Sequence, residues 1–357
     1  MGLPELSFAY STAAQTVVRR SKRGIVALIL QDTAPASGVY TVVHEADIPA
    51  ELGADNQEAV RRALKGYLTA PSKVYLAVIG AAAQPVTGLD LLVGLDYDYI
   101  AGPPTLAPDA ATALATKVKE LRKGNYIGKA VLPGQAADDV GVINLVAEEI
   151  VTGGKKLTAA AYCGRIAGLL AGTPMEGSAT GAALPEVTSV KTMTEKELDA
   201  AMDAGKLVLY HDGRKVRLGR AVNSKTSLTE GEAKILKKIK AIEAIDLIHH
   251  FAVTTADDEY RGQCANTFDN KMVLVAALRD YLLQLEQDEI VEEGSSGAEL
   301  DLKATRAYLV EQGVDVTAMT DEEILHHNTD SYVFIRLSGR IMDAMEDFKI
   351  GLILKNT

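Results

Sequence analysis

The feature that most constrains this fold is a series of short apolar runs, each long enough for one strand. The runs GIVALIL (24–30) and KVYLAVIG (73–80) have no polar face, which is typical of strands that are buried on both sides. Shorter candidate strands follow at 97–102, 126–133 and 141–147. Helical patterns separate these runs, so the sequence predicts an α/β fold with a largely parallel sheet flanked by helices.

Between and after these strands, the first two thirds of the chain contain signals for helices and turns. A helical pattern lies between Pro108 and Gly124, and the positions of these two residues suit its start and its end. A second helix is expected around 158–171. Thr194 and Glu197 form a capping box for a third helix. The pair Asp212-Gly213 lies between two strand patterns and predicts a β-hairpin.

The last third is predicted to be richer in helices. Thr229 and Glu232 are expected to cap a helix whose apolar face includes four isoleucines between 235 and 245. A helix that begins at Asn270 is apolar nearly all round, which predicts deep burial. Residues 292–300 are polar and predict a loop. Thr320 begins a short capped helix.

Both ends of the chain show the two-residue period of a strand with no obvious partner nearby in sequence. At the N-terminal end Leu6, Phe8 and Tyr10 alternate with small residues, and a basic cluster that includes Arg19 and Arg20 follows. At the C-terminal end the alternating apolar residues are Phe348, Ile350, Leu352 and Leu354.

Two interpretations of these terminal strands stay open at this point. Either they complete the protein's own sheet, or they pair with the edge of a sheet in another chain, where unpaired N–H and C=O groups are available. Donation from both ends would join one subunit to two neighbours and build a mesh. An arm of about 20 residues spans about 65 Å when fully extended, which is enough to cross a subunit boundary.

Composition excludes several classes of function. The formal net charge of −11 argues against a general nucleic-acid coat, and no apolar run reaches the length of a membrane span. The first residues lack the basic and apolar regions of a signal peptide. Cys163 and Cys264 are too few for a disulfide framework, so we expect reduced thiols in a cytosolic product.

The sequence offers weak signals for protease and metal chemistry. The segment Gly172–Met175 resembles a subtilase nucleophile segment, but Pro174 stands where the serine would be and has no nucleophile. His44 and His211 are isolated from any triad context. The adjacent histidine pairs at 249–250 and 326–327 lack the four-residue spacing of a two-ligand helix face, and the acidic run 257–259 is typical of a solvated loop.

Nucleotide binding is the stronger alternative. Residues 74–86 run from a strand into a turn, but they contain one glycine where a dinucleotide fingerprint needs three. Gly153-Gly154 is more typical of a turn than of a phosphate cradle. We therefore assign no catalytic, cofactor-binding or metal-binding residues and expect no cofactor. A soluble α/β enzyme that binds a small molecule or nucleotide remains the alternative function.

Several strings, in this order, resemble the contractile tail sheath family. They are SKRGIVALIL near the start, RIAGLLAGTPMEGSATG (165–181), VNSKTSLTEGEAKILKKIKAIEAIDLIHH (222–250), YRGQCANTFDNKMVLVAALRDYLLQLE (260–286) and VFIRLSGRIMDAMEDFKIGLIL (333–354). Each string alone is unspecific, but their order and spacing extend over nearly the whole chain. The chain is most similar in length to the short sheaths of Gram-positive phages and R-type bacteriocins.

The resemblance implies a structural subunit with four parts and no enzymatic activity. These parts are an N-terminal strand-exchange arm (1–22), an α/β sheath domain that is subtilisin-like but non-catalytic (23–222), a C-terminal sheath domain (223–345) and a C-terminal strand-exchange arm (346–357). Such subunits polymerise helically around an inner tube and contract to drive it through a cell envelope. By the same resemblance, the surface that faces the tube is expected near Arg261, Asn266 and Lys271.

The resemblance also implies partners and a location. The expected partners are copies of the chain in a six-fold helical polymer, an inner tube protein, and baseplate and tail-terminator proteins. Neither nucleic acid nor membrane insertion is expected. The subunit would be assembled in the cytoplasm of a bacterial host and would reside in the tail sheath of a virion, a bacteriocin or another contractile injection particle.

Overall fold

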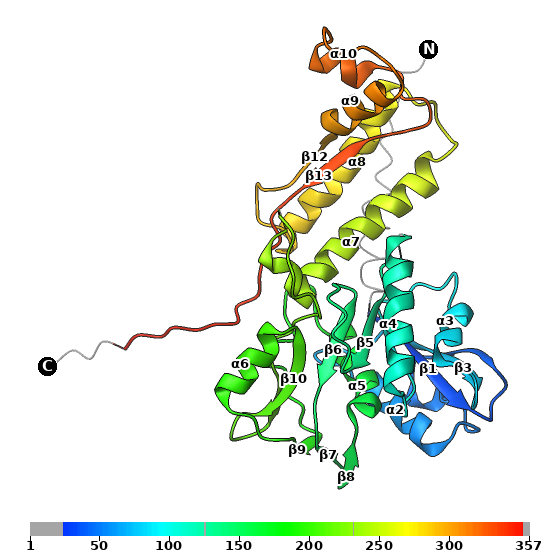
Figure 1. The fold of residues 1–357 in the computed structure, drawn as a ribbon, viewed down its shortest axis with the longest axis vertical. Helices are drawn as coiled ribbons and strands as arrows, with labels where there is room; N and C mark the ends of the chain where they lie inside the picture. Colours follow the sequence, from blue (N-terminus) through cyan, green and yellow to red (C-terminus); the bar gives the residue numbers. More distant parts are fainter. Residues whose placement is uncertain (1–23, 125, 231, 353–357) are drawn as a thin grey trace, which may run out of the picture. The chain divides into compact units, whose positions relative to one another are not determined.

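The computed structural model describes residues 24–124, 126–230 and 232–352, which fall into two compact units (Figure 1). Unit 1 comprises residues up to Ile242 together with Met345 onward, and unit 2 comprises Glu243–Ala344. The terminal segment from Met345 therefore belongs to the same unit as the first two thirds of the chain.

Unit 1 is built around an eight-stranded sheet with the strand order β11-β10-β6-β5-β4-β1-β3-β2. The six inner strands are parallel, and the two edge strands β11 and β2 are antiparallel to their neighbours. This confirms the predicted α/β fold with a mostly parallel sheet. The strands are β1 (Ile25–Asp32), β2 (Gly38–Val42), β3 (Lys73–Gly80), β4 (Tyr99–Ala101), β5 (Lys129–Pro133), β6 (Val142–Val146), β10 (Lys206–His211) and β11 (Val216–Leu218).

Helices cover both faces of this sheet, which explains why its strands lack a polar face. In β1, Val26 and Leu28 belong to one core cluster, while Ala27 and Ile29 belong to a second cluster on the opposite face. The first cluster is closed by α2 (Ala54–Leu64) and α5 (Ala159–Ala171), and the second by α3 (Gly88–Leu91) and α4 (Pro108–Lys123). Strand β1 and the helices α2, α3, α4 and α5 are labelled in the lower part of Figure 1.

Helix α5 approaches α2 closely because it has glycine at the contact. A Cβ atom built on Gly168 would lie 1.9 Å from the carbonyl oxygen of Ala63, so no side chain fits there. Gly164, one turn earlier, faces Leu28 of the central strand. The small residues of α5 therefore let two helices pack side by side on one face of the sheet.

The smaller elements of unit 1 confirm the remaining turn predictions. Gly153-Gly154 form the turn between β7 (Ile150–Thr152) and β8 (Lys155–Leu157), which join β9 (Val187–Ser189) in a three-stranded antiparallel sheet. Asp212 and Gly213 connect the β10–β11 hairpin. The capping box of Thr194 and Glu197 begins α6 (Glu195–Asp203). Short 3₁₀ helices lie at η1 (Glu45–Asp47) and η2 (Pro85–Thr87).

The segment of unit 1 that leads into α7 differs from its prediction. Thr229 and Glu232 form only a turn, and after the 3₁₀ helix η3 (Lys234–Lys237) the helix α7 begins at Ile239. The reason is a tertiary one, because Asn223 binds the carbonyl groups at the end of η3 through its backbone and side-chain N–H groups. The segment is also fixed to the α/β body by Ser224 and Asp138. Unit 1 continues through this segment to Ile242.

Unit 2 is mainly helical, as predicted. It contains the rest of α7 (Ile239–Thr255), a π-helical turn η4 (Ala256–Tyr260), α8 (Phe268–Gln287), α9 (Leu302–Glu311), α10 (Asp321–His326) and a two-stranded antiparallel sheet of β12 (Gly297–Leu300) and β13 (Ile335–Ser338). Part of the predicted loop 292–300 is therefore a strand. The burial predicted for the whole of α8 is wrong, because Met272, Val273 and Leu283 expose 42%, 58% and 41% of their surface.

Candidate functional site

The described end of the chain, residues 345–352, forms neither a helix nor a strand. Its apolar side chains are strongly exposed: Met345 by 87%, Phe348 by 70%, Ile350 by 90% and Leu352 by 82%. No backbone group of this segment has a hydrogen-bond partner in the part of the chain that the structure describes. Figure 1 shows the segment as an extended trace.

This combination is unusual for a segment that belongs to its own subunit. An alternating apolar face normally packs on a core, and an extended backbone normally pairs with another strand. Here Phe348, Ile350 and Leu352 do neither among the described residues. The predicted arm residue Leu354 lies outside the described residues, as do Leu6, Phe8, Tyr10, Arg19 and Arg20 of the predicted N-terminal arm.

The main attachment of the segment to unit 1 is Glu346, whose side chain is only 7% exposed. One carboxylate oxygen, Oε1, accepts hydrogen bonds from Ser178 Oγ at 2.8 Å and Thr180 Oγ1 at 2.7 Å. The other oxygen, Oε2, accepts from Arg220 Nη1 at 3.0 Å and Lys238 Nζ at 3.2 Å. We call Glu346 and these four donors the Glu346 clamp.

Electrostatics favour the ionised form of the clamp. Burial alone would raise the pKa of Glu346, but the hydrogen bonds from Thr180 and Ser178 and the charge of Lys238 together lower it below its ordinary value. The neighbouring Asp347 is exposed and accepts from Arg220 Nη2 at 2.7 Å, which lowers the pKa of Asp347. Arg220 therefore holds two successive carboxylates.

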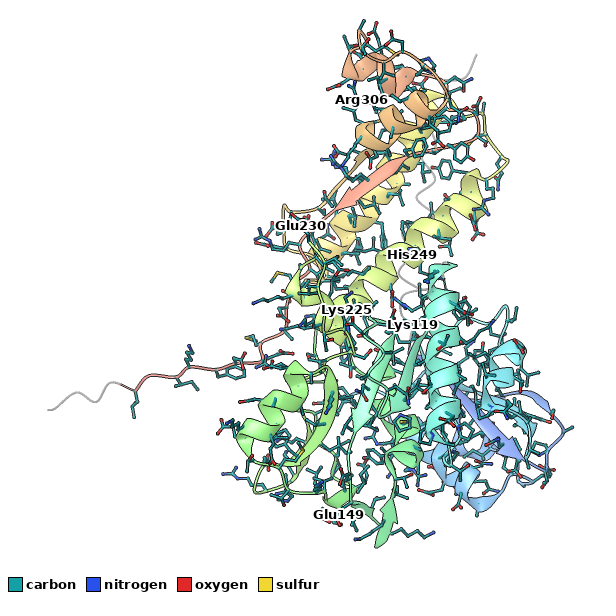
Figure 2. All side chains as sticks on the ribbon, in the orientation of Figure 1. Lys119, Glu149, Lys225, Glu230, His249 and Arg306 are labelled. Atoms are coloured by element: carbon teal, nitrogen blue, oxygen red, sulfur yellow. The ribbon has the colours of Figure 1, made fainter. Side chains whose placement is uncertain are left out.

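A cleft of about 480 Å³ lies beside the clamp in unit 1. Its cationic lining residues outnumber its acidic ones, Asp199 and Asp203. The cationic residues are Arg220, Lys225, Lys234, Lys237 and Lys238, of which Lys225 is labelled in Figure 2. Because the whole chain is strongly acidic, this group of cations forms a local region suited to carboxylates.

Sequence reasoning missed the clamp. It found Glu346 and Asp347 only as acidic residues before an alternating run, and it gave no role to Ser178, Thr180 or Lys238. The donors come from segments far apart in the sequence, the closest being about 110 residues from Glu346. No spacing rule links such positions, and the only available signal was an acidic residue at the start of an apolar strand pattern.

The second candidate feature is a small β-sheet in unit 2. The β12–β13 sheet has only two strands, which pair from Gly297 opposite Ser338 to Leu300 opposite Ile335. A two-stranded sheet is rarely stable alone, and this one packs on α8. The described residues add no third strand to either edge.

The three residues that were predicted to face a tube have different environments, although Asn266 and Lys271 both donate to Thr329 Oγ1. Arg261 follows the π-helical turn, its side chain is 76% exposed, and it pairs with Asp257 at 2.6 Å. Asn266 instead donates to the carbonyl groups of Asp330 and Tyr332. Lys271 is buried and donates to Thr329 Oγ1 at 2.9 Å, so it fixes α8 to the loop before β13.

The residues considered for catalysis are not brought together. His44 caps η1 and His211 ends β10, and both are exposed. Gly172 ends α5, and Pro174 follows in a turn. Within the described ranges, no group of three or more His, Cys, Asp or Glu side chains is arranged to hold a metal ion, and no helix is both long and apolar enough to span a membrane.

The Glu346 clamp predicts a pH dependence of stability. Because the folded-state pKa of Glu346 lies below its unfolded value of about 4.3, its contribution is fully present above that pH and is lost as the pH falls through the folded-state pKa. The free energy of unfolding, measured by urea titration for wild type and Glu346→Gln, should differ by a constant amount above about pH 5. The difference should shrink in more acidic solution. A difference that is independent of pH down to pH 2 would contradict the charged clamp.

Lys271 and Arg261 provide a matched pair of substitutions. Lys271→Ala removes a buried, charged hydrogen-bond donor and should lower the free energy of unfolding by about 2 kcal/mol. Arg261→Ala removes one exposed ion pair and should change it by less than about 0.5 kcal/mol. Urea unfolding followed by circular dichroism measures both. Equal stability losses would show that the environments of these residues are wrongly assigned.

Comparisons with known proteins agree with this architecture. Residues 75–224 match the phage tail sheath protein central domain. The chain is 32% identical over 355 residues to the tail sheath protein of Clostridium phage phiCD119, an alignment that covers 98% of each chain.

Solved structures show the same fold at low sequence identity. The sheath tail protein of Listeria innocua superposes with a TM-score of 0.69 at 15% identity, covering 81% of this chain and 92% of that one. The anti-feeding prophage helical sheath in its contracted state gives a TM-score of 0.67 at 13% identity, covering 94% and 93%. Together with the full-length phage relative, these matches lead to one conclusion: the chain belongs to the phage tail sheath protein family, whose members are structural sheath subunits.

Proposed function

We propose that this sheath protein polymerises with copies of itself around an inner tube and that the resulting sheath contracts to drive the tube through a cell envelope. Residues 1–22 and 346–357 act as arms that donate strands to neighbouring subunits. The α/β domain and the C-terminal domain between them move largely as rigid bodies.

One observation carries the proposal: an alternating apolar segment is left exposed with an unpaired backbone. Phe348, Ile350 and Leu352 expose at least 70% of their surface. An exposed apolar strand of this kind is a liability in a monomer because it invites pairing with another chain. In an assembly the same segment contributes both main-chain hydrogen bonds and buried apolar area.

The β12–β13 sheet of unit 2 is the acceptor that we favour. Its outer edges have no further strand among the described residues, so they are available to strands donated by other subunits. Adding one strand on each side would convert a marginal two-stranded sheet into a four-stranded one. Assembly would then stabilise unit 2 as well as join subunits.

Contraction in this scheme needs no chemical energy source. A sheath assembled in an extended form is metastable, and it releases free energy when new contacts form between subunits in the contracted form. The baseplate assemblies among the structural relatives support association with a baseplate. We further propose a six-fold helical arrangement and contacts with an inner tube protein near Arg261, Asn266 and Lys271. A tail-terminator partner, and assembly in the host cytoplasm before residence in the particle's sheath, complete the proposal.

Removal of the apolar face of the C-terminal arm should prevent assembly without unfolding the subunit. The triple variant Phe348→Ser, Ile350→Ser, Leu352→Ser should keep its unfolding temperature, since these side chains make little contact with their own subunit. Negative-stain electron microscopy across a concentration series should show striated tubes for wild type and none for the variant. Lys349→Ser, which changes a polar position of the alternating pattern in the same segment, should assemble normally. Tubes formed by the triple variant would refute the role of the C-terminal arm.

Deletion of residues 1–20 tests the other arm independently. We expect a folded monomer that fails to form ordered tubes, because the arm supplies contacts between subunits rather than core contacts. Addition of an inner tube protein should not restore a sheath. If the truncated protein forms tubes with the same diameter and repeat as wild type, the assignment of the N-terminal arm is wrong.

A further inference from the structure

We propose that Glu346 is the anchor of the C-terminal arm: it fixes the root of the arm to its own subunit, so that the donated segment begins at Phe348. This inference rests on the proposed strand exchange. It adds the point at which the arm bends and the residues through which tension on the arm enters the subunit.

The burial pattern of the segment singles out Glu346. In most proteins the apolar side chains of a segment are inside and its carboxylates are outside. Here Met345 and Phe348 are exposed, while the carboxylate between them is buried. Hydrophobic packing therefore does not hold the segment in place, and the polar contacts of Glu346 have to do so.

The donors of the clamp connect three separate parts of unit 1. Ser178 and Thr180 lie in the loop after α5, Arg220 follows β11, and Lys238 directly precedes α7. The loop is itself fixed, because Ser178 Oγ accepts from Thr180 N and Thr180 Oγ1 accepts from Ala221 N. The Glu346 carboxylate is thus held by two charged and two neutral donors. The two neutral donors are themselves held in place by hydrogen bonds within unit 1.

Past the clamp, the attachment ends abruptly. Asp347 adds one contact to Arg220, and the described residues after it make no hydrogen bond to unit 1. A neighbour that moves the arm would therefore bend the chain between Asp347 and Phe348. Tension would pass through Glu346 to Arg220 and Lys238, which lie at the end of the sheet and at the start of α7.

The anchor can be tested on the monomer by measuring how widely the distance between the arm and α6 is distributed. Nitroxide labels at Lys349→Cys on the arm and Lys196→Cys on α6 report the position of the arm root within unit 1, in a background where exposed Cys264 is changed to Ser. Cys163 is buried, and burial raises the pKa of its thiol, so it stays unlabelled. In pulsed electron paramagnetic resonance, Glu346→Ala should widen the distance distribution at least twofold. Asp347→Asn, the matched control, should leave most of the narrow component.

The effect on assembly gives a second, separate measurement. Glu346→Ala should raise the critical concentration for tube formation at least tenfold at a temperature at which circular dichroism shows the variant to be folded. Glu346→Gln, which keeps the shape and the hydroxyl contacts, should fall in between. It also serves as the test variant if the alanine variant is poorly folded. Asp347→Asn should stay within about threefold of wild type.

Failure of the anchor and failure of the arm give different results. If deletion of residues 348–357 prevents assembly but Glu346→Ala assembles like wild type, the role of the arm is supported and the anchor is refuted. If the deletion variant assembles normally, the proposed strand exchange fails, and the distance distribution of the monomer still decides whether Glu346 fixes the root. An unchanged distribution in Glu346→Ala overturns the anchor in either case.

Discussion

The central sheet of unit 1 has to bury both of its faces, and the rest of the unit is arranged to meet this requirement. β1 is an inner strand of the sheet with a core cluster on each face, so helices are needed on both sides of it. Glycines in α5 allow the helices to approach closely enough to fill one of these layers. Such close packing transmits displacement rather than absorbing it, which suits a subunit that moves as a rigid body.

Because helices already cover both faces of the central sheet, only a few places remain for attachment to neighbouring subunits. The structure offers three candidates: an exposed terminal segment, a two-stranded sheet with open edges, and the exposed apolar face of α8. The first two are complementary, because a strand without a partner and an edge without a strand satisfy each other. The complementarity works between copies of one chain, and therefore a single sequence can specify a continuous lattice.

The sequence predicted well those features that depend on neighbouring residues. The unbroken apolar run of β1, the box at Thr194 and the turn at Asp212-Gly213 all act over a few positions, and each prediction is confirmed. The predictions failed where distant residues decide the outcome. A turn and the contacts of Asn223 take the place of the helix start predicted at Thr229, and Glu346 was overlooked because its donors lie far away in the chain.

The energetics of strand exchange explain why an anchored arm is useful. Burying Phe348, Ile350 and Leu352 against a neighbour would contribute about 1.5–3 kcal/mol for each side chain. Ordering the backbone of the five residues 348–352 costs about 1–2 kcal/mol per residue, so the two quantities nearly cancel. A root already held at Glu346 reduces the number of arrangements that the arm loses on docking, and preorganisation of this kind shifts the balance towards assembly. A modest gain at each subunit, repeated along a lattice, is enough to make assembly cooperative while each contact stays weak enough to rearrange.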